Sequence, residues 1–392
     1  MKSLKRMMAA VLFLSAVLLC ACGAQTAEEE ASADAQSESG ELTITGSMEL
    51  SYAEQFTVDY CADGCTLITI GGTDEYLVVP EGAEVPSYAA EMTVIQQPLS
   101  DVYLASSAVM DLVVELGALD QIGFTSTSQD SWSVEEAAEA IEEGTLTYIG
   151  KYSAPDYETL LEAGCTLAVE NTMIYHQPEV QEQLENLGIC VLVDKSSYET
   201  HPLGRTEWIR LYGVLLGCDE EAEALFALKE ELFESVLSQV QAQEDEDGPV
   251  AAYFYMTAAG AANIRKPGDY ITKLIEYAGG TYAFTAEDLG LDESGSAQST
   301  MNLQFEAFYE KAKDADVLIY NSSISGALYT LDELIDLNSL FAEFTAVESG
   351  NVWCTEKDMF QQTGAAADIL SEFYAIFTGT AEDEMQFFHR LQ

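Results

Sequence analysis

The sequence predicts an α/β protein of two lobes, each built on a mainly parallel sheet, with one long rigid helix joining them. The first observation is a repeating strand–helix pattern from Thr93 to about Leu216. The second is a shorter block of the same kind after Pro249. The third is a helical stretch between the two blocks, and together they predict two Rossmann-like lobes on a common strut.

The N-terminus has the composition of an export signal. A basic segment, MKSLKRMM, precedes an apolar run that is too short to span a bilayer. The run ends in Leu19-Cys20-Ala21-Cys22, which fits the lipobox pattern, with a small residue just before the second cysteine. We therefore expect residues 1–21 to be a lipoprotein signal peptide and lipidated Cys22 to anchor the protein to a membrane. An ordinary secretory signal is the alternative.

Two further segments precede the strand–helix pattern. Residues 22–41 are rich in Ala, Glu, Ser and Gln, which is typical of a disordered tether. Residues 42–92 alternate polar and apolar side chains and are punctuated by the turn sequences Asp-Gly and Gly-Gly. This second segment is predicted to be a β-hairpin or small meander that extends the first lobe at its edge.

The cysteines are sparse and scattered, so the chain is not a disulfide scaffold. Cys61 and Cys65 flank a turn and are placed to form a bridge across a hairpin. The sequence leaves their pairing open, and likewise that of Cys165 and Cys190.

The remaining chain divides into a first lobe at 93–217, a linking helix at 218–247 and a second lobe at 248–392. Asp219 is the expected N-cap of the linking helix, and acidic residues in its first turn suit the helix dipole. The predicted apolar stripe of this helix consists of Leu225, Leu228, Leu232, Val236 and Val240, with Phe226, Phe233 and Leu237 beside it.

The formal charge of −53 excludes nucleic acid as a partner and disfavours binding to anionic lipid through charge. Against this acidic background, basic residues at predicted strand ends stand out. They are Lys151, Lys195, Arg205, Arg265 and Lys266. We expect Arg205 and Arg265 to bind a ligand carboxylate or phosphate, with an inter-lobe or capping salt bridge as the alternative.

Common catalytic and nucleotide-binding motifs are missing from the sequence: it has no GxGxxG after a strand, no GxxxxGK[ST] and no GxSxG. No catalytic residue is predicted. Only His176, His201 and His389 are available as imidazole ligands, which disfavours a bare-metal site. A haem-ligand role for His176, His201 or a tyrosine stays open, and His201 alternatively caps the helix that begins near Pro202.

Ligands of open α/β sheets lie beyond the carboxyl ends of the strands. The loops predicted there are rich in aromatic, hydroxyl and amide side chains, which suit a bulky, partly apolar ligand. The candidate ligand-binding residues are Tyr103, Trp132, Lys151, Tyr175, His201, Arg205, Tyr255, Arg265, Lys266, Asn321 and Ser322. No cofactor of the protein's own is predicted.

Several segments resemble a known family in order along the chain. VYLASSAVMDLVVELGALDQIGF, PDYETLLEAGCTLAVE, HPLGRTEWIRLYGVLLG, YITKLIEYAGG and FEAFYEKAKDADVLIYNSS are similar to segments of ABC-transporter substrate-binding lipoproteins. The resemblance is to the ferric-siderophore, haem and vitamin B12 binding class and covers about residues 94–380. It leaves the extension at 42–92 outside the family core.

This resemblance implies a monomeric receptor, held on the outer face of the cell membrane or in the periplasm, which captures a metal chelate and hands it to an ABC permease dimer. It also implies that Glu158 and Glu306, each near the start of a helix in its lobe, meet arginines of the two permease subunits. The alternative is that both are ordinary acids in the first turn of a helix, where a negative charge favours the helix dipole.

Two other functions stay open at the level of sequence. An envelope enzyme or chelatase on a two-lobed α/β scaffold would show a nucleophile–base set or a metal cluster at strand ends. A purely structural lipoprotein would lack a deep polar and aromatic cleft. Ligand-dependent melting without turnover would separate the receptor from both.

Overall fold

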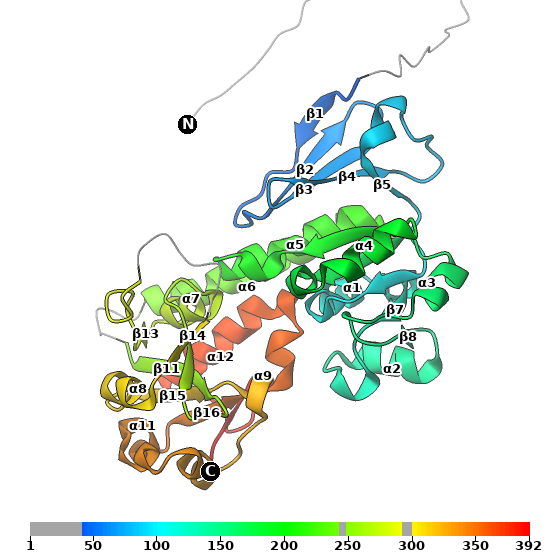
Figure 1. Ribbon diagram of the computed structural model, residues 1–392. Helices are drawn as coiled ribbons and strands as arrows, with labels where there is room; N and C mark the ends of the chain where they lie inside the picture. Colours follow the sequence, from blue (N-terminus) through cyan, green and yellow to red (C-terminus); the bar gives the residue numbers. More distant parts are fainter. Residues whose placement is uncertain (1–40, 243–247, 292–299) are drawn as a thin grey trace, which may run out of the picture. The chain divides into compact units, whose positions relative to one another are not determined.

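A computed structural model describes residues 41–242, 248–291 and 300–392 (Figure 1). The predicted signal peptide, the expected lipidation site Cys22 and almost all of the predicted tether lie outside these residues. Within the described parts of the chain, every helix is too short or too polar to span a bilayer.

The N-terminal extension forms a five-stranded sheet with the order β1-β2-β3-β4-β5. Its first four strands pair antiparallel, and β5 pairs parallel to β4 after a crossover that contains the turn η1 (Ser87–Glu91). Its strands are β1 (Ile44–Ser47), β2 (Phe56–Cys61), β3 (Thr66–Ile70), β4 (Asp74–Val79) and β5 (Thr93–Gln96).

The placement of β5 corrects one prediction. The sequence pattern assigned Thr93 and the residues after it to the first strand of the parallel sheet, but Thr93 pairs with Tyr76 of β4. Only Ile95 of this strand is buried. A strand inside a parallel sheet is buried on both faces, whereas this half-exposed strand suits a sheet edge.

The first lobe has a fully parallel sheet with the order β10-β9-β6-β7-β8, as predicted. Its strands are β6 (Val102–Leu104), β7 (Ile122–Thr125), β8 (Thr147–Tyr148), β9 (Leu167–Asn171) and β10 (Cys190–Asp194). The helices and turns that alternate with them are η2 (Ser107–Val109), α1 (Met110–Glu115), η3 (Leu119–Gln121), η4 (Gln129–Ser131), α2 (Glu135–Glu143), α3 (Tyr157–Ala163), η5 (Thr172–His176), α4 (Pro178–Asn186) and η6 (Ser196–Tyr198).

Two consecutive helices follow the first lobe, α5 (Pro202–Leu216) and α6 (Asp219–Gln241). Helix α6 is the predicted linking helix, although its N-cap is Cys218 and not Asp219. Its N-terminal half contributes Ala222 and Phe226 to the core of the first lobe. Its C-terminal half contributes Phe233 and Val236 to the core of the second lobe, so one helix is part of both cores.

The buried face of α6 differs from the predicted stripe. Leu228 and Leu232 are 53% and 46% exposed, whereas Ala222, Phe226, Phe233 and Val236 are buried. The predicted stripe was centred on the leucines, but the helix turns its aromatic residues inward. Aromatic rings bury more apolar area than leucine, which favours this orientation.

The second lobe has a seven-stranded mixed sheet with the order β14-β12-β11-β15-β16-β17 and β13 beside β11. Strands β11, β13, β15 and β16 pair parallel, and the others pair antiparallel. The strands are β11 (Val250–Met256), β12 (Ala262–Arg265), β13 (Thr281–Tyr282), β14 (Thr300–Leu303), β15 (Val317–Tyr320), β16 (Val352–Thr355) and β17 (Phe388–Arg390).

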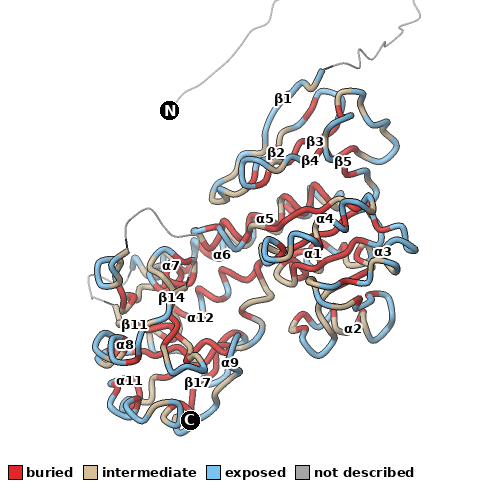
Figure 2. The backbone as a smooth tube through the Cα atoms, in the orientation of Figure 1, coloured by how far each residue is buried: buried red, intermediate tan, exposed pale blue. Residues whose placement is uncertain are grey.

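The helices and turns of the second lobe are α7 (Tyr270–Tyr277), α8 (Phe305–Ala312), α9 (Ser322–Ser325), α10 (Leu331–Leu337), η7 (Ser339–Glu343), α11 (Thr345–Ser349), η8 (Lys357–Phe360), η9 (Thr363–Ala365) and α12 (Ala366–Thr378). The core is rich in stacked phenylalanines, and Figure 2 shows buried backbone concentrated in the strands, α5 and α12.

Two buried carboxylates fasten the extension to α5. Glu207 accepts hydrogen bonds from the backbone N–H groups of Ser51, Tyr52 and Ala53, at 2.9, 2.8 and 2.8 Å. Glu199 accepts from the next two N–H groups, both at 2.9 Å, and from Trp208 Nε1 at 3.0 Å. We call residues 51–55 and these two acids the carboxylate clamp. The clamp gives a structural role to Glu207 and Trp208, which belong to the segment HPLGRTEWIRLYGVLLG.

All six described cysteines are free thiols, including Cys61 and Cys65. The pairing that the sequence left open is therefore absent from the described chain. No group of His, Cys, Asp and Glu among these residues is arranged to hold a metal ion.

Candidate functional site

The candidate site is built from the segments that follow β10 in the first lobe and the antiparallel strand β12 in the second. In the first lobe, the loop after β10 runs through η6 into α5 and carries His201 and Arg205. In the second lobe, the loop after β12 carries Lys266 and leads into α7, whose N-cap is Asp269. Helix α5 therefore brings a basic side chain of the first lobe to the start of a second-lobe helix.

Arg205 lies at this junction. Its guanidinium is 4.0 Å from the centre of the Tyr270 ring, at the first residue of α7. The whole residue is only 9% exposed, and Nε has no acceptor among the residues that the structure describes. By contrast, Arg265 forms an ion pair with Asp269 at 3.4 Å. The sequence gave both arginines the same two possible roles, a ligand contact or a salt bridge. In the structure Arg265 forms a salt bridge, and Arg205 forms none with the described residues.

Further contacts join the lobes near Arg205. Thr206 Oγ1 donates to the carbonyl of Thr363 at 3.2 Å. Asp111, a buried acid on α1, accepts a 2.7 Å hydrogen bond from the backbone N–H of Gly364. Burial raises the pKa of Asp111 to about 7, and the neighbouring Glu115 carboxylate also raises it. This acid therefore bonds the first lobe to η9 at a place where its charge is poorly solvated.

A second bridge between the lobes is made by Gln361. Its Oε1 accepts from the backbone N–H and the hydroxyl of Ser133, at 2.7 and 2.8 Å, and its Nε2 donates to the carbonyl of Ser131 at 2.8 Å. The loop after β16 thus binds the loop between η4 and α2. Trp132, a predicted ligand-binding residue, lies between Ser131 and Ser133 in the sequence. Its side chain is buried, and its Nε1 has no hydrogen-bond partner among the described residues.

His201 has the capping role that the sequence gave as its alternative. Its Nδ1 accepts from the backbone N–H of Leu203 at 3.1 Å. Its ring stacks on Tyr52 of the extension at 4.6 Å and contacts Phe233 and Tyr277. Burial lowers the pKa of His201, which keeps the ring neutral and able to accept that bond.

Tyr103 belongs to a buried polar cluster under α3. Its hydroxyl and both carboxylate oxygens of Glu170 have no hydrogen-bond partner among the described residues, and both residues are 0% exposed. Burial raises the pKa of Glu170 to about 8. Burial also raises the pKa of Tyr103, and the neighbouring Glu170 carboxylate raises it further. Asn321 and Ser322 are also buried: Asn321 caps α9, and Ser322 bonds to Thr355.

The other predicted residues lie nearer the surface. Lys151 is exposed, Tyr175 is 47% exposed, and Tyr255 and Lys266 are partly buried. His176, offered as a haem ligand, is exposed at the end of η5. Arg205 contacts Tyr270, the first residue of α7, and Arg265 pairs with Asp269, the N-cap of the same helix. Lys151 and Tyr175 have no described contact with these residues.

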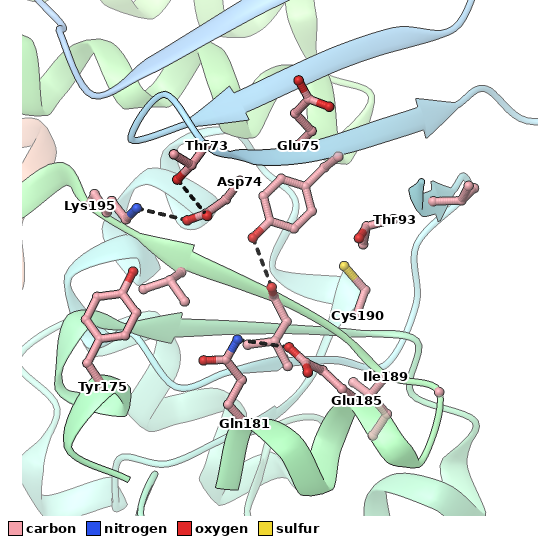
Figure 3. Close-up of a pocket in the computed structure, with 15 residues that line it drawn as sticks. Thr73, Asp74, Glu75, Thr93, Tyr175, Gln181, Glu185, Ile189, Cys190 and Lys195 are labelled. Atoms are coloured by element: carbon pink, nitrogen blue, oxygen red, sulfur yellow. Dashed lines mark hydrogen bonds and ion pairs between the residues drawn. The ribbon is translucent and has the colours of Figure 1, made fainter. Parts of the chain in front are cut away.

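A separate pocket with a volume of about 890 Å³ lies between the extension and β10 (Figure 3). Its lining includes the acids Asp74, Glu75 and Glu185. Lys195, its basic residue, is neutralised by Asp74 at 2.9 Å. The Tyr76 hydroxyl crosses the gap and donates to the carbonyl of Val191 at 3.0 Å. This acidic pocket is unsuited to an anionic chelate, and Tyr175 is the only predicted site residue in it.

The two predicted docking acids occupy matching positions. Glu158 is in the first turn of α3, where Asp156 caps the helix by accepting from the N–H groups of Glu158 and Thr159. Glu306 is in the first turn of α8. Both side chains belong to exposed residues. Each lobe therefore presents one acid at a helix start, as the sequence predicted.

Two α/β units built on one shared helix define a two-lobed binding-protein class. The sequence profile of the periplasmic binding protein family matches residues 102–359, which is more than half of the chain. The protein therefore belongs to the periplasmic binding protein family, a family of substrate-binding proteins. The predicted family and fold class are confirmed. Membership of this family supports an extracytoplasmic location of the protein.

Relatives and solved structures agree with this assignment. Two uncharacterized lipoproteins of Methanocaldococcus jannaschii are similar. One is 25% identical over 303 residues, covering 73% of this chain and 68% of the relative. The other is 21% identical over 356 residues, covering 87% of this chain and 86% of the relative.

Two solved structures show the same fold at low identity. A periplasmic heme binding protein from Pseudomonas aeruginosa has a TM-score of 0.58 at 15% identity, covering 76% of this chain and 99% of its own. A periplasmic binding protein from Veillonella parvula has a TM-score of 0.59 at 13% identity, covering 81% and 98%.

Sequence reasoning missed several residues at the junction. Asp111 had a visible signal, a lone acid within the apolar run AVMDLVV. Glu207 had a similar one, as an acid in a helix that is apolar on all sides. Gln361 and Tyr270 had none, because their roles depend on partners in the other lobe.

Proposed function

We propose that the protein is the extracytoplasmic receptor of an ABC importer, which captures a ferric siderophore, haem or cobalamin between its lobes and delivers it to the permease. The observation that carries this proposal is the family match across both lobes. The shared helix α6 supports it, because a helix with residues in both cores fixes the lobes on either side of one site. Solved structures of similar fold include heme-binding proteins.

Anchoring is the second part of the proposal. Lipidation of Cys22 would hold the receptor at the membrane through a tether of about 20 residues, beside the permease that it serves. The names of the relatives, both lipoproteins, support this reading. Cys22→Ser would leave the precursor unlipidated. Mature wild-type protein without acyl groups, found only in soluble fractions, would contradict the anchor.

Docking through Glu158 and Glu306 is the third part. A pseudo-symmetric receptor that meets a two-fold permease needs a matching contact on each lobe, and these exposed acids occupy equivalent helix starts. The charge would set orientation and association rate more than affinity. The double variant Glu158→Ala/Glu306→Ala is expected to abolish uptake while ligand binding and melting stay near wild type.

The matched control is the double variant Glu162→Ala/Glu310→Ala. Both residues are exposed acids of the same two helices, one turn further on. It removes the same charge but should leave uptake intact. Normal uptake by the first variant would remove the docking role, and loss of ligand affinity would move these acids into the binding site.

The ligand contacts remain proposals. Among the residues named from the sequence, Arg205 is the best placed, because it contacts Tyr270 across the lobe junction. Tyr255 and Lys266 are partly buried candidates, and Tyr103, Trp132, Asn321 and Ser322 are buried.

The direct test is thermal melting of the mature protein with haem, ferric siderophores and cobalamins. Binding to the native state raises the melting temperature by mass action, by about 2.7 kcal/mol of stability at a ligand concentration 100 times Kd. No shift across that panel would contradict the receptor role. A shift accompanied by chemical change of the ligand would favour the envelope enzyme or chelatase instead.

A further inference from the structure

Two loops of the second lobe begin at neighbouring strand ends. Strands β15 and β16 pair parallel, so the loops after them start at the same edge of the sheet, where ligands of open α/β sheets lie. The loop after β15 contains α9, with Asn321 and Ser322, and continues to Leu328. The loop after β16 begins at Glu356 and carries Gln361 to the first lobe. The positions of both loops therefore bear on ligand binding.

His389 of β17 binds both loops. Its Cα lies opposite that of Cys354 in β16, and the residue is only 5% exposed. Its Nδ1 is 2.5 Å from Oε1 of Glu356, in the loop after β16, and its Nε2 is 2.7 Å from the carbonyl oxygen of Leu328, in the loop after β15. Its ring also stacks on Tyr329, with the ring centres 4.8 Å apart. One side chain thus connects the two loops to the last strand.

The two hydrogen bonds of His389 together require a doubly protonated ring. A carboxylate oxygen and a carbonyl oxygen only accept hydrogen bonds, whereas a neutral imidazole has a single N–H donor. When the ring loses one proton, we expect the other to stay on Nδ1, because a hydrogen bond to a carboxylate is the stronger of the two. The lone pair of Nε2 then faces the carbonyl oxygen of Leu328 and repels it.

Two of the groups around this ring keep their charge while histidine titrates, between about pH 5 and 8. Burial raises the pKa of the Cys354 thiol to about 12. The backbone N–H groups of Tyr329 and Thr330 lower the pKa of Glu333, in α10. The other titratable neighbours of the ring are Glu356, the Tyr329 phenol and Glu384, whose backbone bridges to His389. Neither Cys354 nor Glu333 therefore masks a change of charge on the ring.

We propose that His389 is a positioning residue for ligand binding: its doubly protonated ring holds the loop after β15, and loss of one proton releases residues 326–328 and weakens ligand binding. This inference rests on the proposed receptor function and adds a proton-dependent step to it. The release ends at residue 328, because the residues that follow stay bonded to Glu333 and Gln392. The released segment adjoins α9, whose Ile324 is 68% exposed and so accessible to a ligand.

The first measurement is the protonation of the ring, by NMR of the mature protein with ¹⁵N-labelled histidine. The chain has three histidines, and the signal missing from His389→Gln assigns this one. We expect two ring protons at acidic pH and a single proton, on Nδ1, above a transition. Glu356→Gln, at a side chain 33% exposed, should move the transition to lower pH because it removes the negative charge beside the ring. His176→Gln is the matched control, since His176 is exposed and has no described contact with either loop.

The second measurement is hydrogen exchange of the amides at 326–328, expressed as protection relative to the unfolded rate at each pH. Protection should fall about tenfold as the ring loses its second proton, in wild type and in His176→Gln, as loss of a charge-assisted hydrogen bond implies. It should be low at every pH in His389→Gln. If His389→Gln fails to fold, Glu356→Gln decides, because its NMR transition and its fall in protection must move together. A ring with one proton at about pH 5.5, or protection that ignores the transition, would overturn the inference.

The third measurement is the affinity for haemin, ferrichrome and cyanocobalamin on both sides of the transition. A probe that binds should bind wild type about threefold to tenfold more weakly above the transition, whereas His389→Gln should show only the titration of the probe itself. The same pH dependence in both proteins would overturn the inference and leave the receptor role intact. If none of the probes binds, the receptor role falls, and the NMR and exchange results alone decide whether His389 holds the loop.

Discussion

The carboxylate clamp gives the sharpest prediction about stability. Glu207 is 0% exposed and its two oxygens accept three backbone N–H groups and the guanidinium of Arg210, at 2.8 to 3.0 Å. Each hydrogen bond to a charged group contributes about 1.5–3 kcal/mol. The N–H groups of residues 51–53 can hydrogen-bond to water once Glu207 is removed. The variant therefore loses less than the summed free energy of these hydrogen bonds. We expect Glu207→Ala to lower the free energy of unfolding by about 3–5 kcal/mol.

Glu223→Ala is the matched control. Glu223 also pairs with Arg210, at 2.6 Å, but its side chain is 53% exposed. Exposed ion pairs contribute about 0–1 kcal/mol, so this variant should change stability little. Glu207→Gln keeps the shape and one acceptor oxygen and should fall between the two.

Thermal or urea unfolding measures the stability, and hydrogen exchange of the amides at 51–55 locates the effect. At roughly 2–4 °C per kcal/mol for a domain of 150–250 residues, Glu207→Ala should melt roughly 10 °C lower. Its amides at 51–53 should exchange faster than those in β2. If Glu207→Ala and Glu223→Ala unfold alike, with unchanged exchange at 51–53, the clamp is not a stabilising contact and the reasoning fails.

Three further predictions concern other parts of the chain. Burial raises the pKa of Glu170 to about 8, above its unfolded value, so the native state binds an extra proton and stability falls as pH rises from about 4 to 8. Glu170→Gln should flatten this slope when the melting temperature is measured against pH. An unchanged slope would refute the assignment to Glu170. Cys61 and Cys65 are buried free thiols, so these two side chains should resist alkylation in the native protein, and its intact mass should not change on reduction. A gain of two hydrogens would show a disulfide. Gln361→Ala should speed amide exchange at Ser133 while Gln239→Ala, at an exposed glutamine of α6, should not; equal exchange in both would remove the Gln361 bridge.

Local sequence signals accounted for the parallel sheet of the first lobe. Strands such as β9 and β10 are short runs of β-branched and apolar residues bounded by glycine, and each is followed by a helix with its own stop signal. These signals are contained within a few residues, so no distant partner is needed to interpret them. The helix starts of α3 and α8, with Glu158 and Glu306, were found in the same way.

The failures arose where tertiary partners decide. Ile95 is as β-prone as a core strand residue, but β5 lies at the edge of the extension because β4 offers it a pairing edge. Helix α6 carries both leucine and phenylalanine at helical spacing, and the positions of the two lobes decide which face is buried. In the site, Arg205 was found because basic residues are rare, whereas its partner Tyr270 and the bridging Gln361 have no such contrast.

The inter-lobe contacts also bear on how a ligand enters. Asp111–Gly364 and Thr206–Thr363 are buried bonds close to the shared helices, and Gln361 adds three bonds to the first-lobe loop. Wide separation of the lobes would break all of these at once and expose Arg205 together with its aromatic neighbour. A small displacement that opens only the Gln361 bridge costs far less, because that residue is already partly solvated. The energetics therefore favour a local opening of the loop after β16, with α5, α6 and η9 held together, over a wide separation of the lobes.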